Sequence, residues 1–187
     1  MLDLFGAKWA EIQYNQLNDG SAVAVREAIA ADIPRIREYI DQLSPDDRYL
    51  RYMSSISIDA LKDGDRLERI YKTSLEAEFG RRHVAFVVER GAHILGVVHA
   101  WEREVYSAVY ELSYSRRSDH EGCGVGGILM NTILDWARAS GVRTLVADTL
   151  RENHRMRKLF QISGFQEGKN PDDPSVVHYT RIVTPSS

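Results

Sequence analysis

A run of glycines between a predicted strand and a predicted helix constrains the fold of this chain most. Gly122, Gly124, Gly126 and Gly127 fall within six residues, 122–127, which we call the glycine loop. Without Cβ atoms, such a loop leaves its backbone N–H groups open to a ligand. The first turn of the following helix adds N–H groups without intrahelical partners and about half a positive charge. Together these features predict a site for an anion such as a phosphate group.

Two well-known phosphate-binding motifs fit this loop poorly. The string from Gly122 to Gly127 does satisfy the G-x-G-x-x-G pattern of dinucleotide-binding folds. It lies late in the chain, however, after predicted antiparallel strands, and no suitable acidic residue follows about 20 residues on. A P-loop would require Lys and Ser or Thr after its last glycine, whereas Ile128 follows here. The remaining alternative to phosphate binding is a turn that needs only flexibility.

Hydrophobic patterning predicts a mixed sheet with helices packed on it. Apolar and alternating runs predict strands at 22–26, 84–88, 94–98, 108–115, 144–147 and 176–183. Helical spacing predicts helices at 32–43, from 125 to Gly141 and at 153–163, and a mostly helical stretch at 48–80. A hairpin turning at 90–92 argues against a doubly wound parallel sheet. The predicted class is therefore α/β (α+β), with a mostly antiparallel central sheet flanked by helices.

Local signals add detail to these elements. Asp32 is the predicted N-cap of the first helix, and residues 44–47 read as the turn that stops it. Gly96 inside a strand predicts a bulge or a close backbone approach. In the strand before the glycine loop, alternation predicts two faces, which consist of Tyr110, Leu112 and Tyr114 and of Glu111, Ser113 and Ser115.

Composition narrows the function classes. The net charge of −3 and the pI of about 6.1 lack the basic bias of a nucleic-acid-binding protein. The single cysteine excludes an internal disulfide and fits a reducing compartment. Neither a membrane-spanning apolar run nor a signal peptide is apparent, so we expect a cytoplasmic protein without a membrane partner. The spacing of His, Cys and Asp predicts no metal site.

The first 21 residues differ from the rest, and we expect an N-terminal arm at 1–21 followed by one domain at 22–187. The arm is polar with scattered large apolar residues, and it ends in the turn signal Asn18-Asp19-Gly20. A loosely held arm is one interpretation. A short helix that docks on the domain, or on a second subunit in a homodimer, is the other.

The glycine loop and a second motif resemble the GNAT acetyltransferases. The family signature [QR]-x-x-G-x-G/A, between a strand and a helix, is matched in glycine placement by Gly124 and Gly126. The family's later pattern appears as Asn153, Met156, Leu159 and Gly164-Phe165. The resemblance covers about residues 22–183. Within it, residues 43–52 resemble the start of the GNAT domain in bacterial protein lysine acetyltransferases.

The resemblance implies acetyl-coenzyme A (acetyl-CoA) as co-substrate. Its pyrophosphate would lie on the glycine loop, and its pantetheine arm would run between two splayed strands. The implied cofactor-binding residues are Leu112, Ser113, Tyr114, Glu121, Gly122, Cys123, Gly124, Val125, Gly126, Gly127 and Asn153. Glu121 departs from the family, which usually has Gln or Arg there, and Arg116 and Arg117 could offset its charge.

The resemblance also implies a reaction: acetyl transfer to a primary amine, either of a protein lysine or of a small molecule. Glu111 occupies the place of the family's general base, which typically acts through water. Phe160 stands where the family usually has a tyrosine that acts as the general acid, so no general acid is assigned. The alternatives are a catalytically silent domain that binds or senses acyl-CoA, and a structural or regulatory partner.

Overall fold

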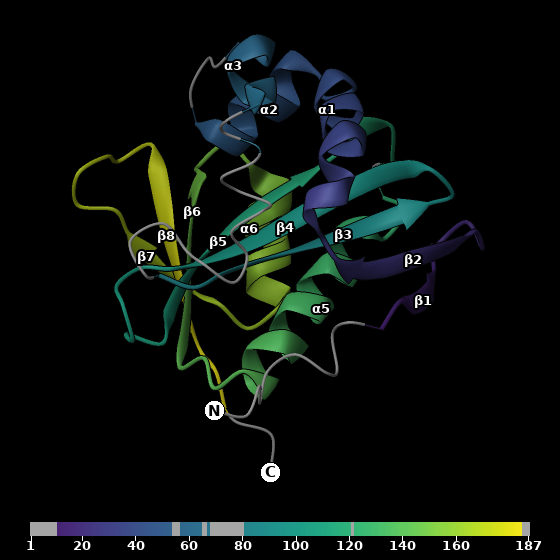
Figure 1. The fold of residues 1–187 in the computed structure, drawn as a ribbon. Helices are drawn as coiled ribbons and strands as arrows, with labels where there is room; N and C mark the ends of the chain where they lie inside the picture. Colours follow the sequence, from purple (N-terminus) through teal and green to yellow (C-terminus); the bar gives the residue numbers. More distant parts are fainter. Residues whose placement is uncertain (1–10, 54–56, 65–66, 68–80, 121, 185–187) are drawn as a thin grey trace.

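The computed structural model describes residues 11–53, 57–64, 67, 81–120 and 122–184. These residues contain an eight-stranded sheet in the order β1-β2-β3-β4-β5-β6-β8-β7 (Figure 1). Its strands are β1 (Gln13–Gln16), β2 (Ala22–Glu27), β3 (His83–Arg90), β4 (His93–Glu102), β5 (Val109–Arg116), β6 (Thr144–Leu150), β7 (Gln166–Lys169) and β8 (Val176–Ile182). The helices are α1 (Ile33–Asp41), α2 (Pro45–Tyr52), α3 (Ile58–Lys62), α5 (Val125–Ala139) and α6 (His154–Ile162).

The sheet is antiparallel between all paired described strands except β5 and β6, which run parallel. Their pairing is short: it begins at Val109 opposite Thr144 and ends at Glu111 opposite Val146. Both strands continue beyond that point, β5 to Arg116 and β6 to Leu150. The two strands therefore separate in the middle of the sheet, and the predicted mixed, mostly antiparallel sheet is confirmed.

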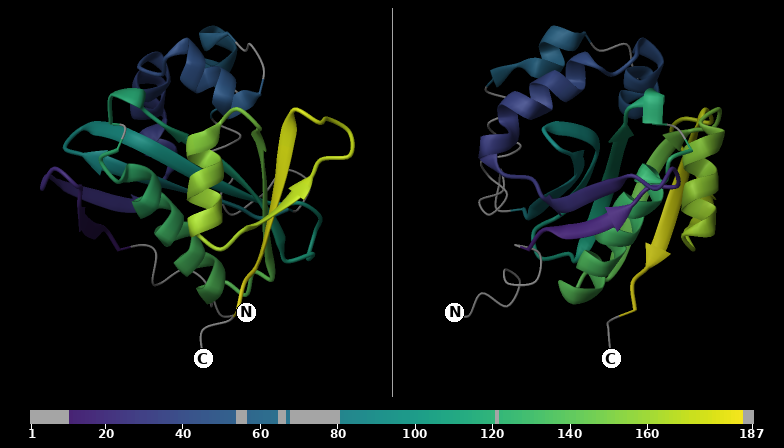
Figure 2. Two further views of the ribbon diagram at one scale, coloured as in Figure 1. Left: turned by 180° about the vertical axis from the view of Figure 1, so that it is seen from behind. Right: turned by 90° about the vertical axis from the view of Figure 1, so that its right-hand side faces the viewer.

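Helices cover both faces of the sheet. On one face, α5 and α6 lie side by side, and α1 to α3 lie together on the other (Figures 1 and 2). Each face buries its own hydrophobic cluster. The cluster beneath α5 includes Leu129, Ile133 and Leu145, and the cluster beneath α1 includes Ile36, Ile40 and Val97. Within the described residues, no helix has both the length and the apolarity needed to cross a membrane.

Gly96 allows α5 to approach the sheet closely, as its place in the strand predicts. A Cβ atom at this position would lie 2.9 Å from Val125 Cγ1 and 3.2 Å from the Ser115 carbonyl oxygen. The β3–β4 register also shifts between Val88, which pairs with Gly96, and Glu89. The beginning of α5, and with it the glycine loop, is thus held against β4.

Two predictions about the N-terminal third are wrong. Residues 13–16 form the edge strand β1, and Leu17 is buried, so the sheet begins inside the segment predicted as an arm. Residues 1–10 of that arm lie outside the described residues. Ser44 does not end a turn but begins α2: its hydroxyl accepts from the Asp47 N–H, and the Asp47 carboxylate accepts from the Ser44 N–H. Residues 44–47 thus form a capping box at the start of a helix, where the sequence predicts a turn that stops one.

Asp32 stands at the predicted N-cap position of α1, but its side chain makes no capping hydrogen bond to that helix. Its carboxylate accepts instead from the Ile29 N–H and from the guanidinium of Arg26 at 2.6–2.7 Å, and Glu89 completes the ion cluster. Asp32 therefore links α1 to β2 through Arg26, and Arg26 in turn reaches Glu89 on β3.

Candidate functional site

A cavity of about 180 Å³ opens where β5 and β6 separate. β5 contributes one wall, from Glu111 to Arg116, and β6 contributes Asp148 and Thr149. The remaining walls come from α2, from the first turn of α5 at Gly126, and from α6. Because the cavity arises from the loss of strand pairing after Glu111, backbone groups of β5 on its β6 side are left without a ladder partner in this cavity.

The glycine loop borders this cavity in a conformation that requires glycine. Gly122 and Gly124 have φ angles of +74° and +98°, and Gly124 is the N-cap of α5. The helical ladder begins with a bond from the Ile128 N–H to the Gly124 carbonyl, over 3.0 Å. The N–H groups of the three residues between them precede that ladder, which is the arrangement that binds anions at helix N-termini.

The predicted cofactor residues divide into two groups. Five of the predicted cofactor residues line the cavity: Leu112, Ser113, Tyr114, Gly126 and Asn153. The predicted base, Glu111, lines it as well. The side chain of Val125 is fully buried in the core, so only its backbone can reach a ligand. The Cys123 side chain packs partly buried against the same core. Gly127 borders a separate hollow with Met130 and Leu159, and Glu121 lies outside the described residues.

Tyr114 links the cavity wall to the glycine loop. Its hydroxyl donates a hydrogen bond to the Gly126 carbonyl over 3.1 Å. Burial raises the pKa of Tyr114 well above its usual value, so the hydroxyl keeps its proton and remains a donor. The strand therefore orients the first turn of α5 directly.

Glu111 lies at the end of the cavity where the two strands still pair. Its side chain is 51% exposed, and Oε2 lies 3.9 Å from Arg103 Nε. Ser113 and Ser115, on the same face as predicted, are only partly buried, and Ser115 accepts a hydrogen bond from the Tyr39 hydroxyl over 2.8 Å. This carboxylate thus faces both solvent and the cavity, with small polar neighbours along the strand.

Asn153 begins α6. Its Oδ1 accepts a hydrogen bond from the Met156 N–H over 3.1 Å, which caps the helix and leaves the amide nitrogen for other partners. The cap sets the position of Leu159 and Phe160, which line the cavity. Phe160 is buried and stacks on Tyr179, with ring centroids 4.9 Å apart, so it contributes shape and no proton.

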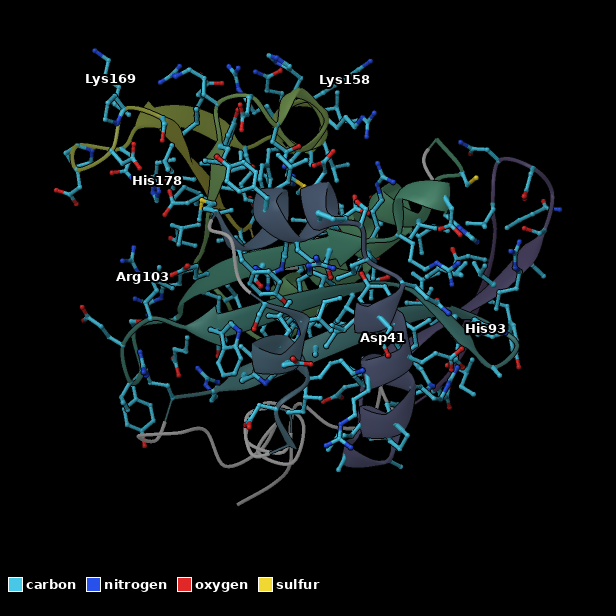
Figure 3. All side chains as sticks on the ribbon, turned by 90° about the horizontal axis from the view of Figure 1, so that it is seen from above. Asp41, His93, Arg103, Lys158, Lys169 and His178 are labelled. Carbon is cyan, nitrogen blue, oxygen red and sulfur yellow. The ribbon has the colours of Figure 1, made fainter. Side chains whose placement is uncertain are left out.

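Sequence reasoning missed several lining residues, and one of these is the carboxylate Asp148. Leu145 and Ala147 face the α5 side, so Asp148 faces the opposite side, as Glu111 does. Its Oδ1 lies 2.8 Å from His178 Nδ1 on β8. Figure 3 shows His178 and Arg103, the respective partners of Asp148 and Glu111, on the same side of the molecule. Period-two alternation continued past Ala147 would have found Asp148.

A second cavity, of about 150 Å³, lies between the sheet and α1 to α3 and shares Arg51 and Ser115 with the first. Its floor includes His99 and Trp101, which stack in a row with His83. Burial lowers the pKa of His83 to about 3 and that of His99 well below its usual value. Both imidazoles are therefore neutral near pH 7, and this wall adds no positive charge.

Comparisons with known proteins agree with this architecture. Residues 48–165 match the family model "Acetyltransferase (GNAT) family". A Pseudomonas aeruginosa protein, acetyltransferase PA5475, is 28% identical over 180 residues, covering 92% of this chain and 89% of that protein. The crystal structure of the GNAT domain of S. lividans PAT has a TM-score of 0.79 at 21% identity and covers 95% of this chain and 99% of its own. Spermidine N-acetyltransferase from Vibrio cholerae, solved with CoA and spermine, has a TM-score of 0.67 at 17% identity, with 86% and 95% covered.

Proposed function

The chain belongs to the GNAT acetyltransferase family, and from this we propose that it transfers the acetyl group of acetyl-CoA to a primary amine, with Glu111 as a water-mediated general base. The observation that carries the proposal is the separation of β5 from β6, which forms one cavity between the glycine loop and Glu111. The chain is an acetyltransferase, and acetyl-CoA is the co-substrate. The roles of individual residues and the identity of the amine acceptor are our proposals.

The proposed cofactor pose follows from the unpaired backbone groups. The diphosphate lies on the amides at the start of α5, where the helix dipole favours negative charge. The pantetheine arm lies along Leu112, Ser113 and Tyr114 and pairs with β5 as an added strand. This edge of β5 is open to such pairing because β6 does not pair with β5 beyond Glu111. Arg116 and Arg155 line the same cavity and add positive charge to it.

The proposed chemistry moves two protons from the amine nitrogen and one acetyl group. An alkylammonium has a pKa near 10.4, so the amine must lose its proton before it attacks. A water molecule between the amine and Glu111 carries that proton to the carboxylate. The amine nitrogen then bonds to the thioester carbon, and backbone N–H groups stabilise the oxyanion. The nitrogen gives up its second proton to water as the C–S bond breaks. Phe160 offers no proton, so the sulfur leaves as a thiolate.

Three carboxylates and three guanidinium groups line the cavity, so it is the local position of the carboxylates, and not the net charge, that favours a cationic acceptor. Asp47, Glu111 and Asp148 line it from three different elements. We propose the side chain of a protein lysine as the acceptor, supported by the resemblance of residues 43–52 and by the fold shared with the GNAT domain of S. lividans PAT. A small-molecule amine is the alternative, as the name of the V. cholerae neighbour illustrates.

The contrary hypothesis is a silent acyl-CoA-binding domain. The family assignment opposes this hypothesis, whereas the buried Phe160, which replaces a proton donor, favours it. Glu111→Gln separates the two candidates, because it removes the base while keeping the shape. We expect kcat to fall about 100-fold, the usual contribution of a general base, with the Kd for CoA unchanged. Glu104→Gln is the matched control, since Glu104 is exposed and does not line the cavity.

The assay follows thiol release from acetyl-CoA with lysine peptides and with polyamines, and calorimetry measures CoA binding. Loss of turnover in the Glu111 variant alone supports the enzyme and its base. Binding of CoA without turnover on any amine supports the silent domain. Equal turnover in both variants would exclude Glu111 as the base.

A further inference from the structure

The turn between β1 and β2 lies against the glycine loop, although 104 residues separate Asn18 from Gly122. Asn18 makes two hydrogen bonds to the loop. Its backbone N–H donates to the Cys123 carbonyl over 2.8 Å, and its Nδ2 donates to the Gly122 carbonyl over 2.6 Å. We propose that Asn18 is a positioning residue that holds the loop in its diphosphate-binding conformation, an inference that rests on the proposed function.

The two bonds orient backbone donors on the opposite side of the loop. In a trans peptide unit the carbonyl and the following N–H point in opposite directions. Because the carbonyls of Gly122 and Cys123 point to Asn18, the N–H groups of Cys123 and Gly124 point away from it. An acceptor-free surface of amides is what an anion requires. Asn18 thus engages the carbonyls that would otherwise be free to turn toward the phosphates and repel them.

The turn that carries Asn18 is itself well held. Leu17 is buried in the core beneath α5, and its N–H donates to the Ser21 carbonyl over 2.8 Å. Gln16 Nε2 donates to the Gly20 carbonyl over 2.9 Å, and Asp19 accepts from both the N–H and the hydroxyl of Ser21. The Asn18 side chain therefore projects from a rigid hairpin rather than from a free arm.

Asn18 also packs against the residue that begins α5. A Cβ atom on Gly124 would lie 3.2 Å from Asn18 Oδ1, 3.5 Å from its Cγ and 3.7 Å from its Nδ2. Since Gly124 is the left-handed N-cap, the hairpin contacts the loop at the point where it turns into the helix. The N-terminal strand pair thereby becomes part of the cofactor site.

Two substitutions test this role. Asn18→Ala removes the side-chain hydrogen bond to Gly122 but keeps the backbone hydrogen bond to Cys123. Because a typical hydrogen bond corresponds to about a fivefold change in an equilibrium constant, we expect the Kd for CoA to rise about fivefold. Asn18→Asp is nearly isosteric, but it replaces the donor with a carboxylate next to a carbonyl and adds negative charge near the diphosphate. We therefore expect a larger loss of affinity for CoA, on the order of 20-fold. Asn15→Ala, at an exposed position on β1 before the turn, is the matched control and should change the Kd for CoA less than about twofold.

The readout compares acetyl-CoA with S-acetyl-pantetheine, which lacks the diphosphate. We expect the Asn18 variants to raise KM for acetyl-CoA at unchanged kcat and to leave kcat/KM for S-acetyl-pantetheine unaltered. The melting temperature should fall by no more than about 2–4 °C, as expected for the loss of one hydrogen bond. Equal losses with both donors, or unchanged KM in both variants, would overturn the positioning role. Failure of the wild-type protein to bind CoA would instead refute the proposed function, so the two failures are distinguishable.

Discussion

Gly96→Ala tests whether contact between β4 and α5 positions the glycine loop. The new Cβ atom would lie 2.9 Å from Val125 Cγ1, 3.0 Å from Leu129 Cδ1 and 3.2 Å from the Ser115 carbonyl oxygen. Val125 and Leu129 are fully buried, so neither side chain can turn into open space. Overpacking of this kind costs about 1–3 kcal/mol, and alanine recovers roughly 0.5 kcal/mol of the entropy cost of glycine in a strand. We therefore expect a net loss of about 1–2 kcal/mol.

Thermal unfolding followed by circular dichroism measures this loss, which corresponds to a fall in Tm of roughly 2–8 °C for a chain of this size. Because Val125 is the first residue of α5, the displaced helix should also raise the Kd for CoA in calorimetry. Gly168→Ala is the matched control: it is also a strand glycine, but its Cβ atom would meet its nearest neighbour, the His178 carbonyl oxygen, at an ordinary 3.7 Å. It should leave the Kd for CoA unchanged and raise Tm by about 1–2 °C, because the entropy gain of roughly 0.5 kcal/mol comes without a clash.

A double-mutant cycle with Val125→Ala localises the clash. Removing Cγ1 leaves a space that the new methyl group at position 96 fills, so the double variant should be more stable than the sum of the single losses predicts. Strict additivity, or a Gly96→Ala protein with the wild-type Tm and CoA affinity, would refute the reasoning that close approach of α5 positions the loop.

Two further predictions concern buried titratable groups. Tyr114→Phe keeps the ring but loses the bond to the Gly126 carbonyl, so we expect about 1 kcal/mol lower stability and a few-fold higher KM for acetyl-CoA, measured by denaturant unfolding and steady-state kinetics. Unchanged values would mean that Tyr114 does not orient the loop. The pKa of His83 is lowered to about 3 by burial, so the unfolded chain binds a proton there before the folded chain does, and stability falls as pH drops from about 6.5 toward 3. His83→Phe should remove up to about 2 kcal/mol of the loss between pH 6.5 and pH 5 in urea titrations at several pH values, and an unaltered pH dependence would contradict this.

Local sequence patterns predict many of the helices and strands of this fold. The hairpin of β3 and β4, the alternating faces of β5 and the helices α5 and α6 follow from periodicity and from glycine positions, because those patterns act over a few residues. β7 was missed, since all of its residues are exposed and it lacks an apolar pattern. Ser44 was misread for a different reason: Ser-Pro-Asp-Asp serves equally as a turn or as a helix start, and only packing chooses between them.

The amino-acid sequence alone indicates the family and the glycine loop that we propose for the cofactor, because glycine spacing is a local backbone requirement. The tertiary structure alone decided where β5 and β6 part, since the register between two strands depends on the whole sheet. It also brought Asp148 to the face of Glu111 and the Asn18 turn to the glycine loop. These contacts join residues far apart in the chain, and no local pattern specifies which distant partner will satisfy a hydrogen bond.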